Sequence, residues 1–135
     1  MADITITAAN VLVGGLGTTK EAGVDITAGQ LVYIDTAASN VVKLALVSAA
    51  ASAVVYGMAL NDAVAGQPVA ILTSGSVDVG AVLGDVGHVF CLGGVAGKMA
   101  DIADLAASDY VSIIGYATDS NTLVLSIVNS GLVYA

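Results

Sequence analysis

Two stretches of this 135-residue chain repeat each other at a nearly constant spacing. The segment GQLVYI begins at Gly29, and the similar segment GHVFCL begins at Gly87, 58 residues later. Gly57 in VVYGMAL and Gly115 in IIGYA are also 58 residues apart, and the spacing falls to 56 at the closing Ser-Gly pair. A repeat of this length is typical of one supersecondary unit used twice. Because no reactive residue recurs with it, the repeat indicates a structural or interaction protein more than an enzyme.

Turn residues divide both copies into short segments of high β propensity. Leu31–Asp35 and His88–Leu92 follow glycines and are rich in branched and aromatic side chains. Pro68–Ser74 begins with a proline, which a strand tolerates at its first position. The alanine-rich stretch Lys98–Ala107 predicts either a short helix or an irregular excursion. Many short strands with turns between them predict an all-β fold, a small β-barrel or β-sandwich built from two related β units.

The predicted organisation is a single β domain preceded by an arm. A chain of this size forms one domain, or two small lobes that share a core. Residues 1–23 predict an extended N-terminal arm, because Gly14–Thr19 is glycine-rich and shows no strand pattern. The β domain then covers residues 24–135, with the internal repeat at approximately 28–75 and 86–131.

The composition predicts an interface. Hydrophobic residues make up 57% of the chain and charged residues only 10%, whereas an ordinary domain is roughly 25% charged. Large exposed apolar patches mark interfaces, so we expect an oligomer, a chain bound to a larger assembly, or both. The apolar tail is expected to pair with a sheet edge or to pack against a partner. The candidate interface residues lie in the arm and the tail: Ile4, Ile6, Val11, Leu12, Val13, Leu16, Leu132, Val133 and Tyr134.

The net charge of −8 excludes several classes of partner. Lys20, Lys43 and Lys98 are the only cations, so we expect no nucleic-acid binding, which needs clustered basic residues. The uncharged run Leu44–Asn61 approaches the length of a membrane span. Its counterpart in the second copy, Lys98–Tyr116, carries three aspartates, so we expect no membrane association. No basic residue precedes Lys20, and a secretory signal is therefore not expected.

The residues that could carry chemistry form no constellation. Gly93–Met99 resembles a phosphate-binding loop but has one residue too few between its glycines and lacks the hydroxyl residue after the lysine. A turn between strands is the preferred interpretation. The single histidine, His88, predicts a polar residue at a strand edge. No Ser-His-acid arrangement is indicated, and we expect no catalytic residue and no cofactor.

The acidic residues and the single cysteine also favour structural roles. Asp101, Asp104 and Asp109 lie close together in sequence but lack the spacing of a calcium loop, so a solvated face is preferred over a metal site. Cys91 lies within an apolar run and predicts a buried, unreactive thiol.

The glycine-spaced strands resemble a known family. The segments that carry the resemblance are Ala28–Asp35 (AGQLVYID), Val55–Ala59 (VYGMA), Ala65–Ile71 (AGQPVAI) and Gly75–Val79 (GSVDV). They resemble the small capsid cement, or head decoration, proteins of tailed bacteriophages, over roughly residues 20–131. That resemblance implies a small β-barrel or β-sandwich and trimers that clamp neighbouring major capsid proteins. It implies no catalytic residues.

From this resemblance we expect a structural virion protein on the outer surface of the phage head. The expected partners are the major capsid protein and further copies of the chain in a homotrimer, without cofactor, metal, nucleic acid or membrane. A β-rich fibre, tail or cell-surface adhesin module is the alternative, and an enzyme is a third possibility that the residues do not favour.

Overall fold

The chain folds into a curled antiparallel sheet that forms a half-barrel, which confirms the predicted all-β class. The computed structural model describes residues 4, 6, 11–80, 83, 84, 86–104 and 106–134, and for residues 12–16 it describes the backbone alone. Within these ranges the strands are β1 (Leu12–Glu21), β2 (Leu31–Asp35), β3 (Val41–Leu44), β4 (Gly57–Ala59), β5 (Pro68–Asp78), β6 (Val89–Leu92), β7 (Met99–Asp101), β8 (Tyr110–Ala117) and β9 (Thr122–Val133).

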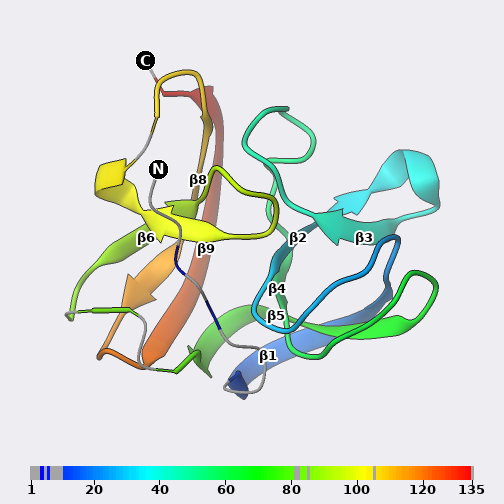
Figure 1. The fold of residues 1–135 in the computed structure, drawn as a ribbon, viewed down its shortest axis with the longest axis horizontal. Helices are drawn as coiled ribbons and strands as arrows, with labels where there is room; N and C mark the ends of the chain where they lie inside the picture. Colours follow the sequence, from blue (N-terminus) through cyan, green and yellow to red (C-terminus); the bar gives the residue numbers. More distant parts are fainter. Residues whose placement is uncertain are drawn as a thin grey trace.

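Strand β5 joins the two halves of the sheet. The strand order is β3-β2-β4-β5-β9-β8-β6-β7, and β1 pairs with the other edge of β5 along its length. β4 pairs with β5 at Leu72 and Ile71, whereas β9 pairs with β5 from Gly75 to Asp78. We call β2, β3, β4 and the start of β5 the first unit, and β6–β9 the second unit. In Figure 1 the first unit lies on the right and the second on the left.

Equivalent backbone hydrogen bonds recur in the two units. Gly29 donates its N–H to the carbonyl of Ala59 at 2.8 Å, and Gly87 donates to Ala117 at the same distance. Both glycines have a positive φ, 93° and 86°, a conformation that glycine adopts without strain. The glycine that opens each sequence repeat therefore makes the same turn into the same kind of strand.

The glycine inside each repeat allows close contact between neighbouring strands. Gly57 lies opposite Val32 of β2, and Gly115 lies opposite Phe90 of β6. A Cβ atom at Gly57 would overlap the carbonyl oxygen of Leu72 on β5, and a Cβ atom at Gly115 would overlap that of Val124 on β9. The 58-residue spacing thus places a glycine on the third strand of each unit, β4 or β8, where this strand contacts the fourth, β5 or β9.

The units differ in the loop that follows the glycine-containing strand, β4 in the first unit and β8 in the second. Met58 lies opposite Leu72, and Tyr116 lies opposite Val124, so the fourth strands are related by a shift of 52 residues instead of 58. The six extra residues of the first unit lie between its third and fourth strands. There Ala63 forms a β-bridge with Ile26 and covers the interior of the first unit.

Two apolar clusters fill the molecule. The smaller cluster lies inside the first unit, where Gly23 donates its N–H to Val42 at 2.8 Å and closes the ring of β3, β2, β4, β5 and β1. The larger cluster fills the second unit and the junction between the units. Ile4 donates its N–H to Met99 of β7 at 2.9 Å and packs against this larger cluster. Residues near the N-terminus therefore contact the edge strand of each unit, which is β3 in the first unit and β7 in the second.

Polar side chains join the units across the junction. The Asn129 amide of β9 accepts a hydrogen bond from the Val55 N–H at 2.9 Å and donates one to the Val55 carbonyl at 3.1 Å. The buried Ser112 of β8 donates its hydroxyl to the carbonyl of Ala53. The Asn129 side chain therefore forms with Val55 the two hydrogen bonds that the backbone of a neighbouring strand would otherwise form.

The prediction of an unpatterned arm up to residue 23 was wrong for residues 12–21. Leu12–Glu21 forms the ten-residue strand β1, whose partners run from Asp78 to Pro68 on β5. Gly17 explains why a glycine-rich segment pairs here: a Cβ atom at this position would lie 2.5 Å from the carbonyl oxygen of Ile71. Residues 1–3, 5 and 7–10 lie outside the described residues.

The alanine-rich segment after Lys98 contains no α-helix in the residues described. It forms the short strand β7 and then a single 3-10 turn, η3 (Ile102–Asp104). Another 3-10 turn, η2 (Thr36–Ala38), connects β2 to β3 in the first unit. The irregular alternative was therefore the correct one for this segment.

We predict that Gly57→Ala and Gly115→Ala each lower the free energy of unfolding by about 1–3 kcal/mol, because overpacking of this kind has that cost. Gly66→Ala is the control: Gly66 has a φ of 90° but no atom within 4 Å of an added Cβ, so only backbone strain of about 1–2 kcal/mol applies. Urea unfolding followed by circular dichroism measures all three. Equal stability of the Gly57 variant and the wild type would contradict the close strand contact.

We predict that Asn129→Ala lowers the free energy of unfolding by about 1–3 kcal/mol, because it leaves the N–H and carbonyl of Val55 without their partner. Asn121→Ala is a comparison at an exposed turn, where water replaces the lost contacts. Hydrogen exchange at the Val55 amide provides a direct measurement. Unchanged protection of that amide in Asn129→Ala would show that Asn129 does not join the units.

Candidate functional site

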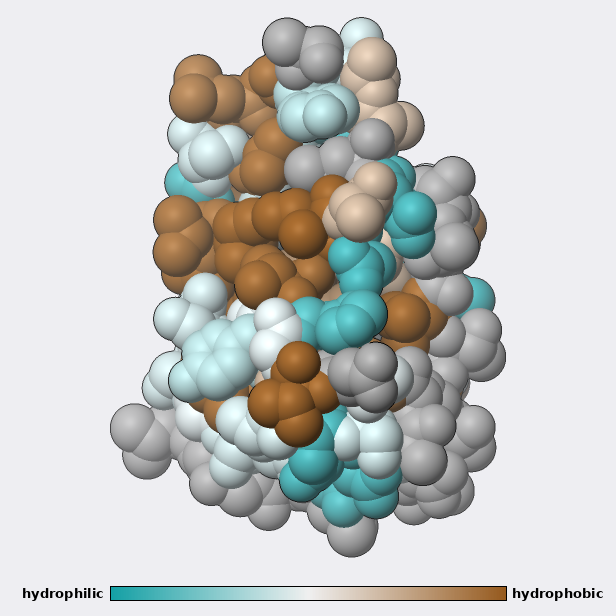
Figure 2. Space-filling view, turned by 90° about the vertical axis from the view of Figure 1, so that its left-hand side faces the viewer, coloured by the Kyte–Doolittle hydropathy of each residue, from teal (hydrophilic) through white to brown (hydrophobic). Residues whose placement is uncertain are grey.

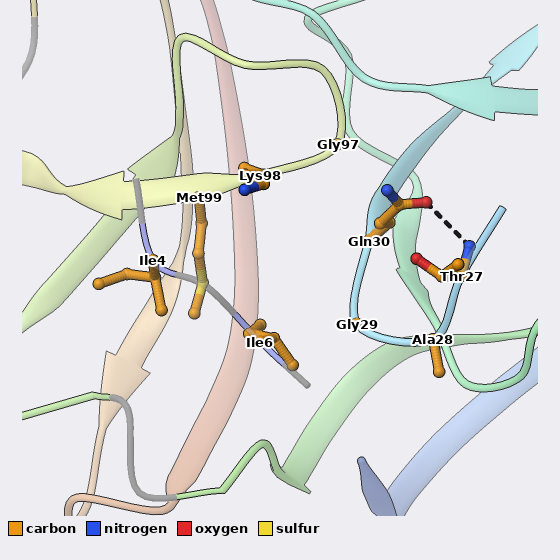
Figure 3. Close-up of a pocket in the computed structure, with 9 residues that line it drawn as sticks. All are labelled: Ile4, Ile6, Thr27, Ala28, Gly29, Gln30, Gly97, Lys98 and Met99. Carbon is orange, nitrogen blue, oxygen red and sulfur yellow. Dashed lines mark hydrogen bonds between the residues drawn. The ribbon is translucent and has the colours of Figure 1, made fainter. Parts of the chain in front are cut away.

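A small pocket lies at the junction of the units (Figure 3). Its volume is about 120 Å³, and Ile4, Ile6 and Met99 gather on one side of it while Thr27 and Gln30 lie on the other. The Gln30 side chain already accepts a hydrogen bond from the Thr27 N–H at 2.9 Å. Ligand pockets usually enclose about 300–1,000 Å³. This pocket is therefore a feature of the junction and too small for a typical ligand.

A wider groove opens beside the C-terminal part of β1. Its volume is about 580 Å³. The Lys20 ammonium lies 5.8 Å from the centre of the Tyr56 ring. The Asn129 amide on the groove wall is hydrogen-bonded to the backbone of Val55. The groove is lined by Lys20, Ile34, Thr36, Asn40, Val54, Val55, Tyr56 and Asn129. A lysine above an aromatic ring, in a groove lined by both polar and apolar residues, does not indicate a particular reaction.

The acidic residues predicted as a solvated face separate in the structure. Asp101 is half-buried and accepts a hydrogen bond from the Ala103 N–H, and its carboxylate lies 2.7 Å from His88 Nδ1. The Ala103 N–H and, after it, His88 lower the pKa of Asp101. Asp104 is exposed, and Asp109 is partly exposed. Among the described residues no three His, Cys, Asp or Glu side chains gather into a possible metal site.

The predicted turn between β6 and β7 is confirmed. Gly93 donates its N–H to Lys98 at 2.7 Å, and β6 and β7 pair in antiparallel orientation around it. Gly97 has a φ of 76° and donates to the carbonyl of Ala45 in the first unit at 2.9 Å. The backbone of this loop is used to join the units and does not form a phosphate cradle.

Cys91 is buried, as predicted. Loss of hydration and, after it, the negative charge of Asp101 raise the pKa of its thiol to about 11. A thiol of this pKa is protonated at neutral pH and is a poor nucleophile.

The predicted interface residues fall into three groups. Ile4, Ile6 and Val11 are partly buried and pack against the larger cluster of their own chain. Leu12, Val13 and Leu16 belong to β1, but their side chains lie outside the described part of the structure. The three residues of the tail are exposed: Leu132 (70%), Val133 (47%) and Tyr134 (46%). We call these three the C-terminal strip.

The C-terminal strip is held in a fixed conformation by β8 and the turn before it. Val133 lies opposite Tyr110, and the Tyr134 N–H donates to the carbonyl of Asp109 at 2.8 Å. Ser108 in turn donates its N–H to the carbonyl of Tyr134 at 2.8 Å. The predicted pairing of the tail with a sheet edge is therefore confirmed.

A second apolar surface was not predicted. Figure 2 faces the side of the molecule that carries the second unit, and apolar side chains gather there in a broad band. Strand register places six uncharged residues on the outward side of β6, β8 and β9, which we call the outer face. Tyr116 and Val128 are its most exposed large residues, at 44% and 58%. The outer face comprises Val89, Ile113, Tyr116, Val124, Ser126 and Val128.

The sequence contains one signal for this outer face. β8 and β9 read YVSIIGYA and TLVLSIV at their cores, with apolar residues at nearly every position instead of every second one. A strand that is apolar on both sides is normally covered on both sides. Leu123 and Leu125 point into the core. The alternate residues therefore face outward, and no residue that the structure describes covers them fully.

None of the helical segments within the described ranges is long and apolar enough to cross a bilayer. Comparison of the sequence with protein-family models and with curated proteins gives no match.

We predict that Cys91 in the native protein reacts with a thiol reagent such as DTNB at pH 8 far more slowly than in the unfolded chain, because the thiol is buried and its pKa is raised to about 11. Absorbance of the released thionitrobenzoate measures the rate. The same protein in guanidinium chloride serves as the control and should release one equivalent. Rapid stoichiometric reaction of the native protein would contradict a buried thiol.

Proposed function

We propose that this chain is a non-enzymatic structural protein, a cement protein that binds the outer surface of a tailed-phage head and stabilises contacts between major capsid proteins. The observation that carries the proposal is the C-terminal strip, an exposed apolar surface whose Leu132 is 70% exposed. The resemblance of the glycine-spaced strands to cement proteins supports the choice of the phage head as the target.

The rigidity of the strip supports a role in docking. Ser130 donates its hydroxyl to the carbonyl of Val111 at 2.6 Å, and the same oxygen accepts from the Leu132 N–H at 3.1 Å. These bonds and the pairing with β8 order the strip before it meets a partner. An ordered surface loses less conformational entropy on binding than a flexible tail does.

The proposed mechanism is the burial of apolar surface across the boundary between capsid subunits. Full burial of one Leu or Val side chain contributes about 1.5–3 kcal/mol, so the strip of a single copy binds weakly. In the proposed homotrimer, three linked strips bind the same assembly together, and the effective affinity rises through avidity. Such a protein needs no cofactor or catalytic group, in keeping with the expectation from the sequence.

We predict that the purified chain binds stoichiometrically to expanded heads that lack it and raises the temperature at which those heads release DNA. Leu132→Asp should lose most of this binding, because a carboxylate would be buried without a partner. Val64→Asp is the matched control, since Val64 is 53% exposed on the first unit. Co-sedimentation and a thermal-release assay measure both effects.

Absence of stoichiometric binding together with unchanged thermal release would overturn the proposal. Binding of the chain to defined sugars on a glycan array would instead point to the adhesin or fibre alternative.

A further inference from the structure

The outer face of the second unit has a counterpart in the first unit that is completely covered. Leu31, Met58 and Leu72 are direct cross-strand neighbours on β2, β4 and β5. All three are 0% exposed and belong to the larger apolar cluster. The same cluster contains Phe90 and Ile114 of the second unit, together with apolar residues of the segment between β3 and β4. In the first unit, therefore, this face packs against β structure of the same chain.

The same row of residues recurs in the second unit. Val89, Tyr116 and Val124 are direct cross-strand neighbours on β6, β8 and β9, in the order found in the first unit. Val89 and Tyr116 occupy the repeat positions of Leu31 and Met58. Yet Tyr116 is 44% exposed, and Val89 and Val124 are only partly buried. The internal repeat thus supplies one covered and one uncovered copy of a single packing surface.

The outer face is matched to an uncharged partner. Its six residues include no Asp, Glu, Lys or Arg, although the chain carries a net charge of −8. Two copies that meet at this face bring no carboxylates into direct opposition. Sheets that pack face to face bury rows of apolar side chains from both layers, as the first unit's row is buried inside the chain.

The face also continues into the interface within the chain. β9 pairs with β5 at Leu123 and Leu125, and these residues point into the junction cluster, whereas the alternate residues Val124 and Val128 belong to the outer face. One side of β9 therefore already serves as a sheet-packing surface between units, and the other side presents the same kind of surface to solvent.

We propose that a second copy of this chain docks on the outer face, so that Tyr116, Val124 and Val128 of one copy are buried against its neighbour in the oligomer. A closed rotation axis that passes beside this face brings identical residues together in a small oligomer. The inference deepens the proposed function, because it assigns the face at which the copies of the proposed homotrimer meet, and it is tested on the chain alone in solution.

The test is the oligomeric state of the full chain by sedimentation velocity and light scattering over a wide concentration range. Wild-type protein should self-associate. Val128→Asp should raise the dissociation constant at least about tenfold, which corresponds to about 1.4 kcal/mol. Tyr116→Asp should have a similar effect. Val64→Asp is the control, because its exposure of 53% matches the 58% of Val128 and it lies outside the outer face.

Two results would overturn the inference: a wild-type protein that remains monomeric at all concentrations, or an oligomer that both outer-face variants leave unchanged. Circular dichroism checks that each variant is folded, and Val128→Asp decides alone if Tyr116→Asp does not fold. Leu132→Asp separates the two proposals, because it should impair head binding while the chain still self-associates.

Discussion

Strand β5 forms backbone hydrogen bonds along both edges, and both units depend on it. One edge pairs with β1, and the other pairs first with β4 and then with β9. A single strand therefore belongs to both curled halves of the sheet, and the larger apolar cluster fills the space between them. The glycines at positions 57 and 115 let the neighbouring strands approach closely enough for each unit to curl. Without this shared strand, two short repeats would have no common core.

The fold class could be predicted because glycines and strand segments recur at fixed spacing, and local turn chemistry is visible in the sequence. β1 could not be predicted in this way. Its glycines have low β propensity, and its partner is a strand far away in the chain, where Gly17 fits closely against Ile71. The outer face escaped prediction for another reason. β8 and β9 are apolar on both sides, so alternation does not reveal which side the rest of the chain covers.

The repeat also accounts for the unusual composition. The first unit buries its interior with the longer loop that carries Ala63, and it buries its outer row against the second unit. The second unit has a shorter loop, and no third layer covers its outer face within the described part of the chain. Among the described residues, Tyr116, Val128 and the C-terminal strip supply five of the eleven exposed large apolar residues.

The pairing of β1 with β5 has a consequence for the nascent chain. Glu21 lies opposite Pro68, and Leu12 lies opposite Asp78, so β1 leaves the ribosome well before its partner exists. At a synthesis rate of about 5–20 residues per second, the wait lasts roughly 2–10 s. An apolar strand left unpaired for that time would invite aggregation with other chains. The sequence LVGGLGTTKE, with its glycines, threonines and terminal charges, is suited to remaining soluble until β5 is made.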